Sequence, residues 1–141
     1  EDIRGLDFIT RLRPVSYNVH PIELHRIWGT PDSVLKNINH TEVEKTLYTG
    51  LIAQEVEKAA QESGFEFTGI EKPKNDKEVY ALKYTEFIMP MIKAIQEQNT
   101  QVEKMAESME RLKTENAAIK KEKEELELRL LKIEKALEDL K

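Results

Sequence analysis

Residues 91–141 read MIKAIQEQNTQVEKMAESMERLKTENAAIKKEKEELELRLLKIEKALEDLK. All five glycines and all five prolines of the chain come before this segment, and Pro90 is the last of them. Most of the segment consists of Glu, Lys, Gln, Ala, Leu, Met and Ile, the residues that lose least free energy on entering a helix. The composition therefore predicts one long helix without an internal break.

Apolar residues recur along this helix at alternating steps of three and four, counted from Ile88. The count defines sixteen core positions over more than seven heptads, and thirteen of them are apolar. Three or four such heptads already indicate a coiled coil. We interpret the polar core residues Asn116 and Lys123 as devices that fix the register at some cost in stability. The predicted interface between associated chains consists of Ile88, Met91, Ile95, Val102, Met105, Met109, Leu112, Ile119, Leu126, Leu130, Ile133, Leu137 and Leu140.

An amphipathic helix more commonly packs its apolar face on its own domain. Length argues against that here, because some 50 residues at about 1.5 Å each span roughly 75 to 80 Å. A compact head of about 85 residues has a diameter of only roughly 30 Å. A helical hairpin would need turn residues, and the sequence has no glycine or proline after Pro90. The apolar face is therefore expected to pack against another chain.

The charges beside the core favour a parallel arrangement. In a parallel coil, the position before one core layer faces the position five residues later on the neighbouring helix. Two such pairs attract and one repels: Glu115 with Lys120 and Arg129 with Glu134 attract, and Glu122 with Glu127 repels.

The number of strands stays open on these rules. β-Branched residues at the first core positions near the head, such as Ile88 and Val102, suit two strands. Leu130 and Leu137 combined with Ile133 suit three or four.

The chain is expected to be an α+β protein, with a small mixed head at 1–87 and the coiled-coil helix at 88–141. Alternating polar and apolar residues predict short strands at 14–19, 48–53 and 79–84. Helical spacing predicts helices at 54–60 and among the first dozen residues, where Ile3, Leu6, Ile9 and Leu12 are three apart. Residues 20–45 are interpreted as an inserted excursion with a turn at 29–32 and a short helix within 33–45.

Composition excludes several classes of function. The formal net charge is −5 and the isoelectric point is about 5.4, which argues against binding to a nucleic-acid backbone. No apolar run approaches the roughly 18 to 20 residues that span a bilayer, so no membrane segment is expected. The chain has no cysteine, and His20, His25 and His40 fit no metal-binding template, so neither a metal nor another cofactor is expected. Trp28 lies beside the turn at 29–32 and is interpreted as a local hydrophobic anchor.

Three motifs follow one another in the head. They are LRPVSY at 12–17, GLIAQEVE at 50–57, and a segment that runs from Tyr84 to the helix start PMIKAIQE at 90–97. In order and spacing they resemble the endosialidase-type intramolecular chaperone domain, the peptidase S74 family, over nearly the whole chain. The residues that carry this resemblance are Pro14, Tyr17, Gly50, Ile52, Ala53, Gln54, Glu55, Val56, Pro90 and Ala94.

The resemblance implies a C-terminal module of phage tailspikes, tail fibres and some other trimeric surface proteins. Such a module trimerises its parent chains, assists the folding of the segment upstream of it, and is then released by self-cleavage. Its partners would be two further copies of itself and, as folding client, the upstream part of its own parent chain. The location implied is the bacterial host cytoplasm during phage assembly, or a virion or surface fibre to which the module is attached or from which it is released.

The family's self-cleavage uses a serine at the scissile bond and a lysine five residues later, near the start of the domain. A desolvated lysine of lowered pKa can act as general base for the serine hydroxyl. Aligning residues 1–6 with that pattern places Glu1 and Leu6 where the serine and lysine belong. The dyad is therefore expected to lie upstream, no serine of this chain is expected to replace it, and the chain is not expected to be catalytic.

Two other functions fit the same features. One is an autoprotease module that releases an upstream domain of a membrane-anchored transcription regulator, in which the same domain type occurs. The other is a structural trimerisation tag without a role in folding. The residues upstream of Glu1 would distinguish the parents, because they would carry either a β-helical stalk or a DNA-binding domain.

Overall fold

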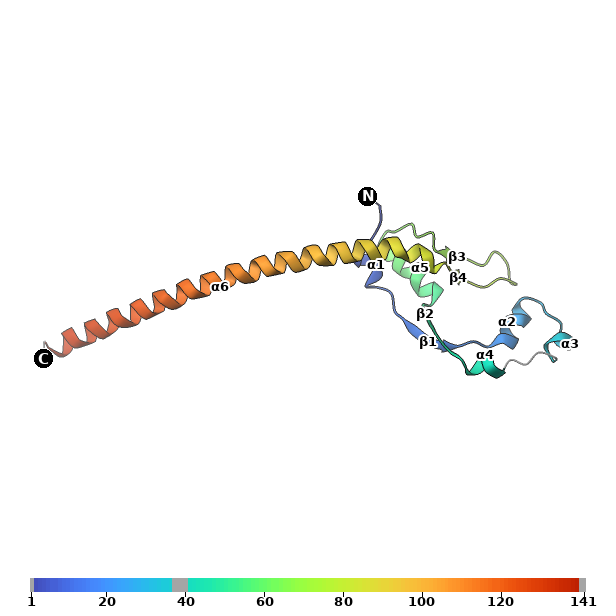
Figure 1. The fold of residues 1–141 in the computed structure, drawn as a ribbon, viewed down its shortest axis with the longest axis horizontal. Helices are drawn as coiled ribbons and strands as arrows, with labels where there is room; N and C mark the ends of the chain where they lie inside the picture. Colours follow the sequence, from blue (N-terminus) through green and yellow to red (C-terminus); the bar gives the residue numbers. More distant parts are fainter. Residues whose placement is uncertain (1, 37–40, 140–141) are drawn as a thin grey trace. The chain divides into compact units, whose positions relative to one another are not determined.

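The computed structural model describes residues 2–36 and 41–139, and its elements are drawn in Figure 1. They divide into two compact units, Glu1–Gln98 and Asn99–Lys141. The first unit is a mixed α+β head together with the first turns of the long helix. The second unit consists of the rest of that helix.

Two small antiparallel sheets lie in the head. β1 (Val15–Asn18) pairs with β2 (Leu47–Gly50), and Val15 lies opposite Gly50. β3 (Ile70–Glu71) pairs with β4 (Ala81–Leu82). The strand predicted at 14–19 is confirmed in shorter form. The strand predicted at 48–53 lies at 47–50 instead, because Ala53 already belongs to a helix. The strand predicted at 79–84 is reduced to two residues, because Tyr84 already belongs to a 3₁₀ turn, η1 (Tyr84–Phe87).

The predicted excursion lies between the two strands of the first sheet. Its described residues form three short helices: α2 (Pro21–Ile27), α3 (Asp32–Leu35) and α4 (Thr41–Lys45). Gly29 has a φ of +79°, which is consistent with the turn predicted there.

Helix α5 (Ala53–Glu62) follows β2 after a two-residue link. It ends in a Schellman motif, in which Phe65 N–H donates to the Ala60 carbonyl at 2.9 Å and Gly64 N–H donates to the Gln61 carbonyl at 3.1 Å. Gly64 has a φ of +61°, as that motif requires. The motif turns the chain back so that Phe65 packs against the core.

The core of the head is built from all four phenylalanines of the chain. Phe8, in α1 (Leu6–Ile9), has no exposed surface, and its ring centroid lies 5.2 Å from that of Phe65 and 5.0 Å from that of Phe67. Phe67 and Phe87 are in contact edge to face, with centroids 4.6 Å apart. Helix α5 contributes the buried residues Val56, Ala59 and Ala60 to the same cluster. The core therefore joins segments from both ends of the head.

The long helix α6 (Ile88–Glu138) is continuous over 51 residues, as predicted. Pro90 does not break it because it lies in the first turn, where the backbone N–H has no helical partner. The chain is thus a mixed α+β protein with two small antiparallel sheets and a long C-terminal helix.

Candidate functional site

The first turns of α6 carry the head on one side and an uncovered apolar face on another. Pro90 and Ala94 are buried. Gly5 lies against the backbone of Lys93 and Ala94 so closely that an added Cβ would lie 2.7 Å from Ala94 N. Leu6 N–H donates to the Glu97 carboxylate at 2.8 Å. The segment around Gly5 is therefore held against the face of α6 that carries Pro90, Ala94 and Glu97.

The predicted interface residues of this segment are exposed. Ile88, Met91 and Ile95 lie roughly 130° around the helix axis from Pro90, Ala94 and Glu97, at about 100° per residue. The head thus leaves the apolar core positions of these turns open.

The apolar face continues along the second unit. The predicted interface residues from Val102 to Leu137 all belong to α6, and all of them are exposed. Over the whole helix, the twelve described interface residues have exposed fractions of 43 to 64%. Leu140, the thirteenth, lies outside the described residues. A row of bare leucine, isoleucine, methionine and valine side chains is typical of interaction surfaces, so this face is the candidate site.

The three motifs come together in the head. Pro14 leads into β1, and Tyr17 of β1 contacts Gly50 of β2, where an added Cβ would lie 3.2 Å from the Tyr17 ring. The hydroxyl of Tyr84, from the third motif, accepts a hydrogen bond from Leu51 N–H at 3.0 Å. The strand, the strand-to-helix link and the start of α6 therefore form one connected substructure.

The GLIAQEVE motif contains residues of the core and residues of the surface. Ile52 precedes the first turn of α5, Ala53 and Val56 are buried, and Gln54 is exposed. Glu55 accepts two hydrogen bonds from the Arg13 guanidinium, at 2.5 and 3.1 Å. These bonds, opposed by partial desolvation, lower the pKa of Glu55 and raise that of Arg13. The motif thus connects α5 to the chain just before β1.

A pocket of about 410 Å³ opens beside the start of α6. Its lining is almost wholly apolar and includes Ile9, Leu12, Leu51, Tyr84, Phe87 and Met91. We call it the apolar pocket. Met91 belongs both to this pocket and to the apolar face of α6, so the two surfaces are continuous.

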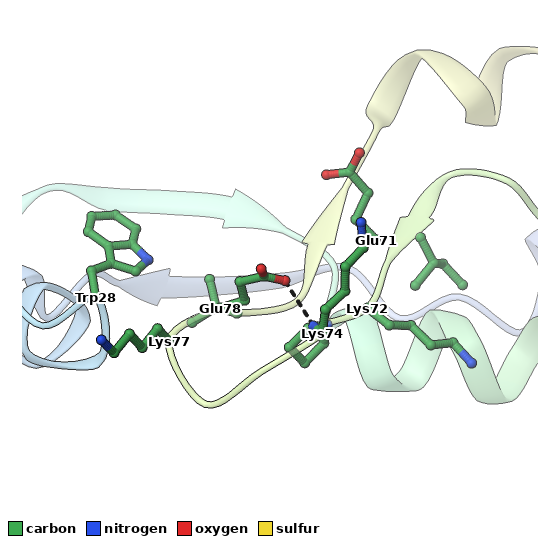
Figure 2. Close-up of a pocket in the computed structure, with 9 residues that line it drawn as sticks. Trp28, Glu71, Lys72, Lys74, Lys77 and Glu78 are labelled. Atoms are coloured by element: carbon green, nitrogen blue, oxygen red, sulfur yellow. Dashed lines mark hydrogen bonds between the residues drawn. The ribbon is translucent and has the colours of Figure 1, made fainter.

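A second cavity, of about 830 Å³, lies between Trp28 and the loop that joins β3 to β4 (Figure 2). Trp28 is 48% exposed and contacts His25 edge to face, so it is less enclosed than the anchor that we expected. Three charged side chains around this cavity have partners: Lys72 pairs with Glu57, Glu71 pairs with Lys83, and Glu78 accepts a hydrogen bond from Lys74 N–H at 2.8 Å.

No candidate metal centre is found among the described residues. They contain no group of three or more His, Asp or Glu side chains that could hold a metal ion, and His40 lies outside them. One serine of the chain, Ser108, does have a lysine five residues later, Lys113. Five residues in α6 place these side chains about 140° apart around the helix, and Lys113 pairs with Glu110 at 3.3 Å. This pair therefore cannot act as a serine–lysine dyad.

No protein family model matches this chain, and neither does any curated protein or solved structure. Within residues 2–36 and 41–139, no helix is long and apolar enough to cross a membrane. The candidate functional site is therefore defined by the geometry of the chain itself: the apolar face of α6 and the head beside its first turns.

Proposed function

We propose that this chain is an intramolecular chaperone module of the peptidase S74 type, which forms a homotrimer through a parallel coiled coil of α6. The observation that carries the proposal is the uncovered row of apolar core residues along this helix. Each such side chain contributes about 1.5 to 3 kcal/mol when fully buried, so a row of twelve favours association strongly.

The contacts of the head support a role beyond association. The motifs that resemble the chaperone family meet in one substructure, and the head leaves the core positions in the first turns of α6 exposed. Three helices can then pair without displacing the heads. The parent chains would enter the module as neighbours and begin to fold in register with part of their association entropy already paid.

The mass of the assembly tests the coiled coil. Light scattering of the purified chain at micromolar concentration is expected to give three times the 16.4 kDa chain mass. A monomer would refute association, and a dimer or tetramer would refute the trimer.

Substitution in the core tests which face associates. Leu112→Asp should abolish assembly, because it places a carboxylate in the apolar core. Ala117→Asp is the matched control, since Ala117 is exposed and lies one residue after the core position Asn116. Both variants should keep the circular dichroism of the head, and equal assembly of the two would refute the predicted register.

A comparison of parent proteins separates a chaperone from a structural tag. The soluble trimer yield of a parent chain is measured with this module and without it. In two further variants, a foreign trimeric coiled coil replaces either α6 alone or the whole module. A chaperone role predicts that the yield depends on the head. Full rescue by the foreign coil in place of the whole module would reduce the function to trimerisation.

A further inference from the structure

The apolar pocket lies on a particular side of the helix, and that side has a defined neighbour in a coiled coil. Taking Ile88 and Met91 as heptad positions a and d, Ile92 occupies position e, and Phe87, the last residue of η1, takes the place of position g directly before α6. Phe87 and Met91 both line the apolar pocket. The pocket therefore lies on the d and g flank of its own chain.

In a parallel coiled coil, position g of one helix faces position e five residues later on the next helix. Phe87 of one chain then faces Ile92 of its neighbour. Ile92 is 44% exposed in the single chain. Met89, at position b on the same flank as Ile92, is 55% exposed. Two bare apolar side chains are thus expected opposite an empty apolar pocket.

The sequence distinguishes this heptad from all later ones. Flanking e positions of coiled coils are usually polar or charged, because they lie at the edge of the core. From Asn99 onward, the e positions of α6 are Asn99, Ala106, Lys113, Lys120, Glu127 and Glu134. Ile92 is therefore the one large apolar residue at an e position of α6, and it is in the heptad that lies beside the head.

From this geometry we infer that the apolar pocket binds the first turns of α6 from a second copy of the chain, with Ile92 as the inserted side chain and Met89 beside it. The inference rests on the proposed parallel coiled coil. It assigns the head a specific role in assembly: each head fixes the position of the neighbouring helix along the axis of the coiled coil. The hydrogen bond from Leu51 N–H to the Tyr84 hydroxyl fixes one wall of the pocket before the neighbour binds.

Disulfide trapping tests the contact directly, since the natural chain has no cysteine. Thr49, which also lines the pocket, and Ile92 are both changed to cysteine in the full chain. Mild oxidation should link the chains into covalent trimers on a non-reducing gel. The matched control joins Ile92→Cys with Lys74→Cys, which lines the other cavity, and should not give covalent trimers.

Substitution measures the contribution of the contact. Ile92→Gln should weaken the association of chains by about tenfold or more, because a large apolar side chain is no longer buried. Ala106→Gln places the same residue at an e position two heptads further along and should change the dissociation constant by less than about threefold. Sedimentation equilibrium of the full-length variants gives both constants.

The outcomes separate the two proposals. Suppose that the chain forms trimers, that no disulfide forms between cysteines at positions 49 and 92, and that Ile92→Gln and Ala106→Gln change the dissociation constant equally. That result would overturn the pocket contact and leave the coiled coil intact. A wild-type chain that is monomeric would overturn both. Cross-linked trimers together with a selective effect of Ile92→Gln would support both.

Discussion

At the scale of single residues, stability of the head depends on a few side chains that come from distant parts of the sequence. Phe8 is the clearest case, because it contacts Phe65, Phe67 and Phe87 and has no exposed surface. Apolar residues three apart predicted the short helix near the N-terminus, but Phe8 is not one of them. Ile3, which is one of them, is 42% exposed.

Phe8→Ala should destabilise the head by about 3 to 5 kcal/mol, since it removes a fully buried aromatic ring and leaves a cavity. The free energy of unfolding is measured by urea denaturation with near-ultraviolet circular dichroism as the signal. Ile3→Ala serves as control and should cost less than about 1 kcal/mol, because that side chain is already partly in water. Equal losses in the two variants would contradict the central place of Phe8.

The pair formed by Arg13 and Glu55 predicts a pH dependence. The guanidinium lowers the pKa of Glu55 below its ordinary value of 4.5, so the folded state binds that proton less readily than the unfolded state. The stabilisation is present in full above pH 4.5 and is lost as the pH falls through the lowered pKa of the folded state. We expect Glu55→Gln to be less stable than the wild type at pH 7 and to approach it as the pH falls below 4.5.

Thermal unfolding of both proteins across pH 3 to 7 measures this difference. Both side chains are more than a third exposed, so the effect should be small. A difference that grows towards low pH would contradict the assigned partner.

At the scale of elements, the two kinds of structure in this chain differ in how far the sequence determines them. Helix α6 follows from local composition and period, and the structure places its start at Ile88 as expected. Sheet pairing depends on contacts between distant residues, so β3 was not predicted: its two residues offer no alternation to detect. Glu55 accepts hydrogen bonds from Arg13, 42 residues away, and a pairing over that distance leaves no local pattern in the sequence.

The candidate site likewise has one part that the sequence predicts and one part that it does not. The apolar face of α6 could be predicted because a heptad pattern needs only the local sequence. The apolar pocket could not, since Ile9, Leu51 and Phe87 come from three elements and meet only in the folded head. The sequence did contain one signal of it, namely Ile92 at a flanking position that is polar or small in every later heptad.

The end of α5 gives a prediction about backbone conformation. Gly64 has a positive φ, and an added Cβ would meet no atom within 4 Å. Gly64→Ala should therefore cost about 1 to 2 kcal/mol through backbone conformation alone, without a steric clash. Gln61→Ala, in the last turn of the same helix, is the control and should be close to neutral. Chemical denaturation of both variants provides the measurement, and a neutral Gly64→Ala would contradict the positive φ.

At the scale of the whole molecule, the boundary of the head lies within α6 rather than at its start. The head was expected to occupy residues 1–87, whereas the compact unit extends to Gln98 and includes the buried Pro90 and Ala94. The first turns of the helix therefore serve both the head and the predicted coiled coil.

Truncation tests this double role. A chain that ends at Gln98 should keep a cooperative unfolding transition of the head and be monomeric, since most core positions are gone. A chain that ends at Phe87 should be less stable by several kcal/mol, because it loses the buried Pro90 and Ala94 and the hydrogen bond between Leu6 and Glu97. Equal melting temperatures for the two would contradict the compact unit.

The bond between Leu6 and Glu97 also sets an order of events during synthesis. It joins residues 91 apart, and the core around Phe8 likewise needs Phe87. A ribosome adds roughly 5 to 20 residues per second, so a nascent chain leaves Phe8 without its final partners for several seconds. The head can close only after its strands and the first turns of α6 have emerged. Any segment that precedes residue 2 in a parent chain would by then be fully outside the ribosome. Under the proposed function, the module would therefore act last, after its client has been synthesised.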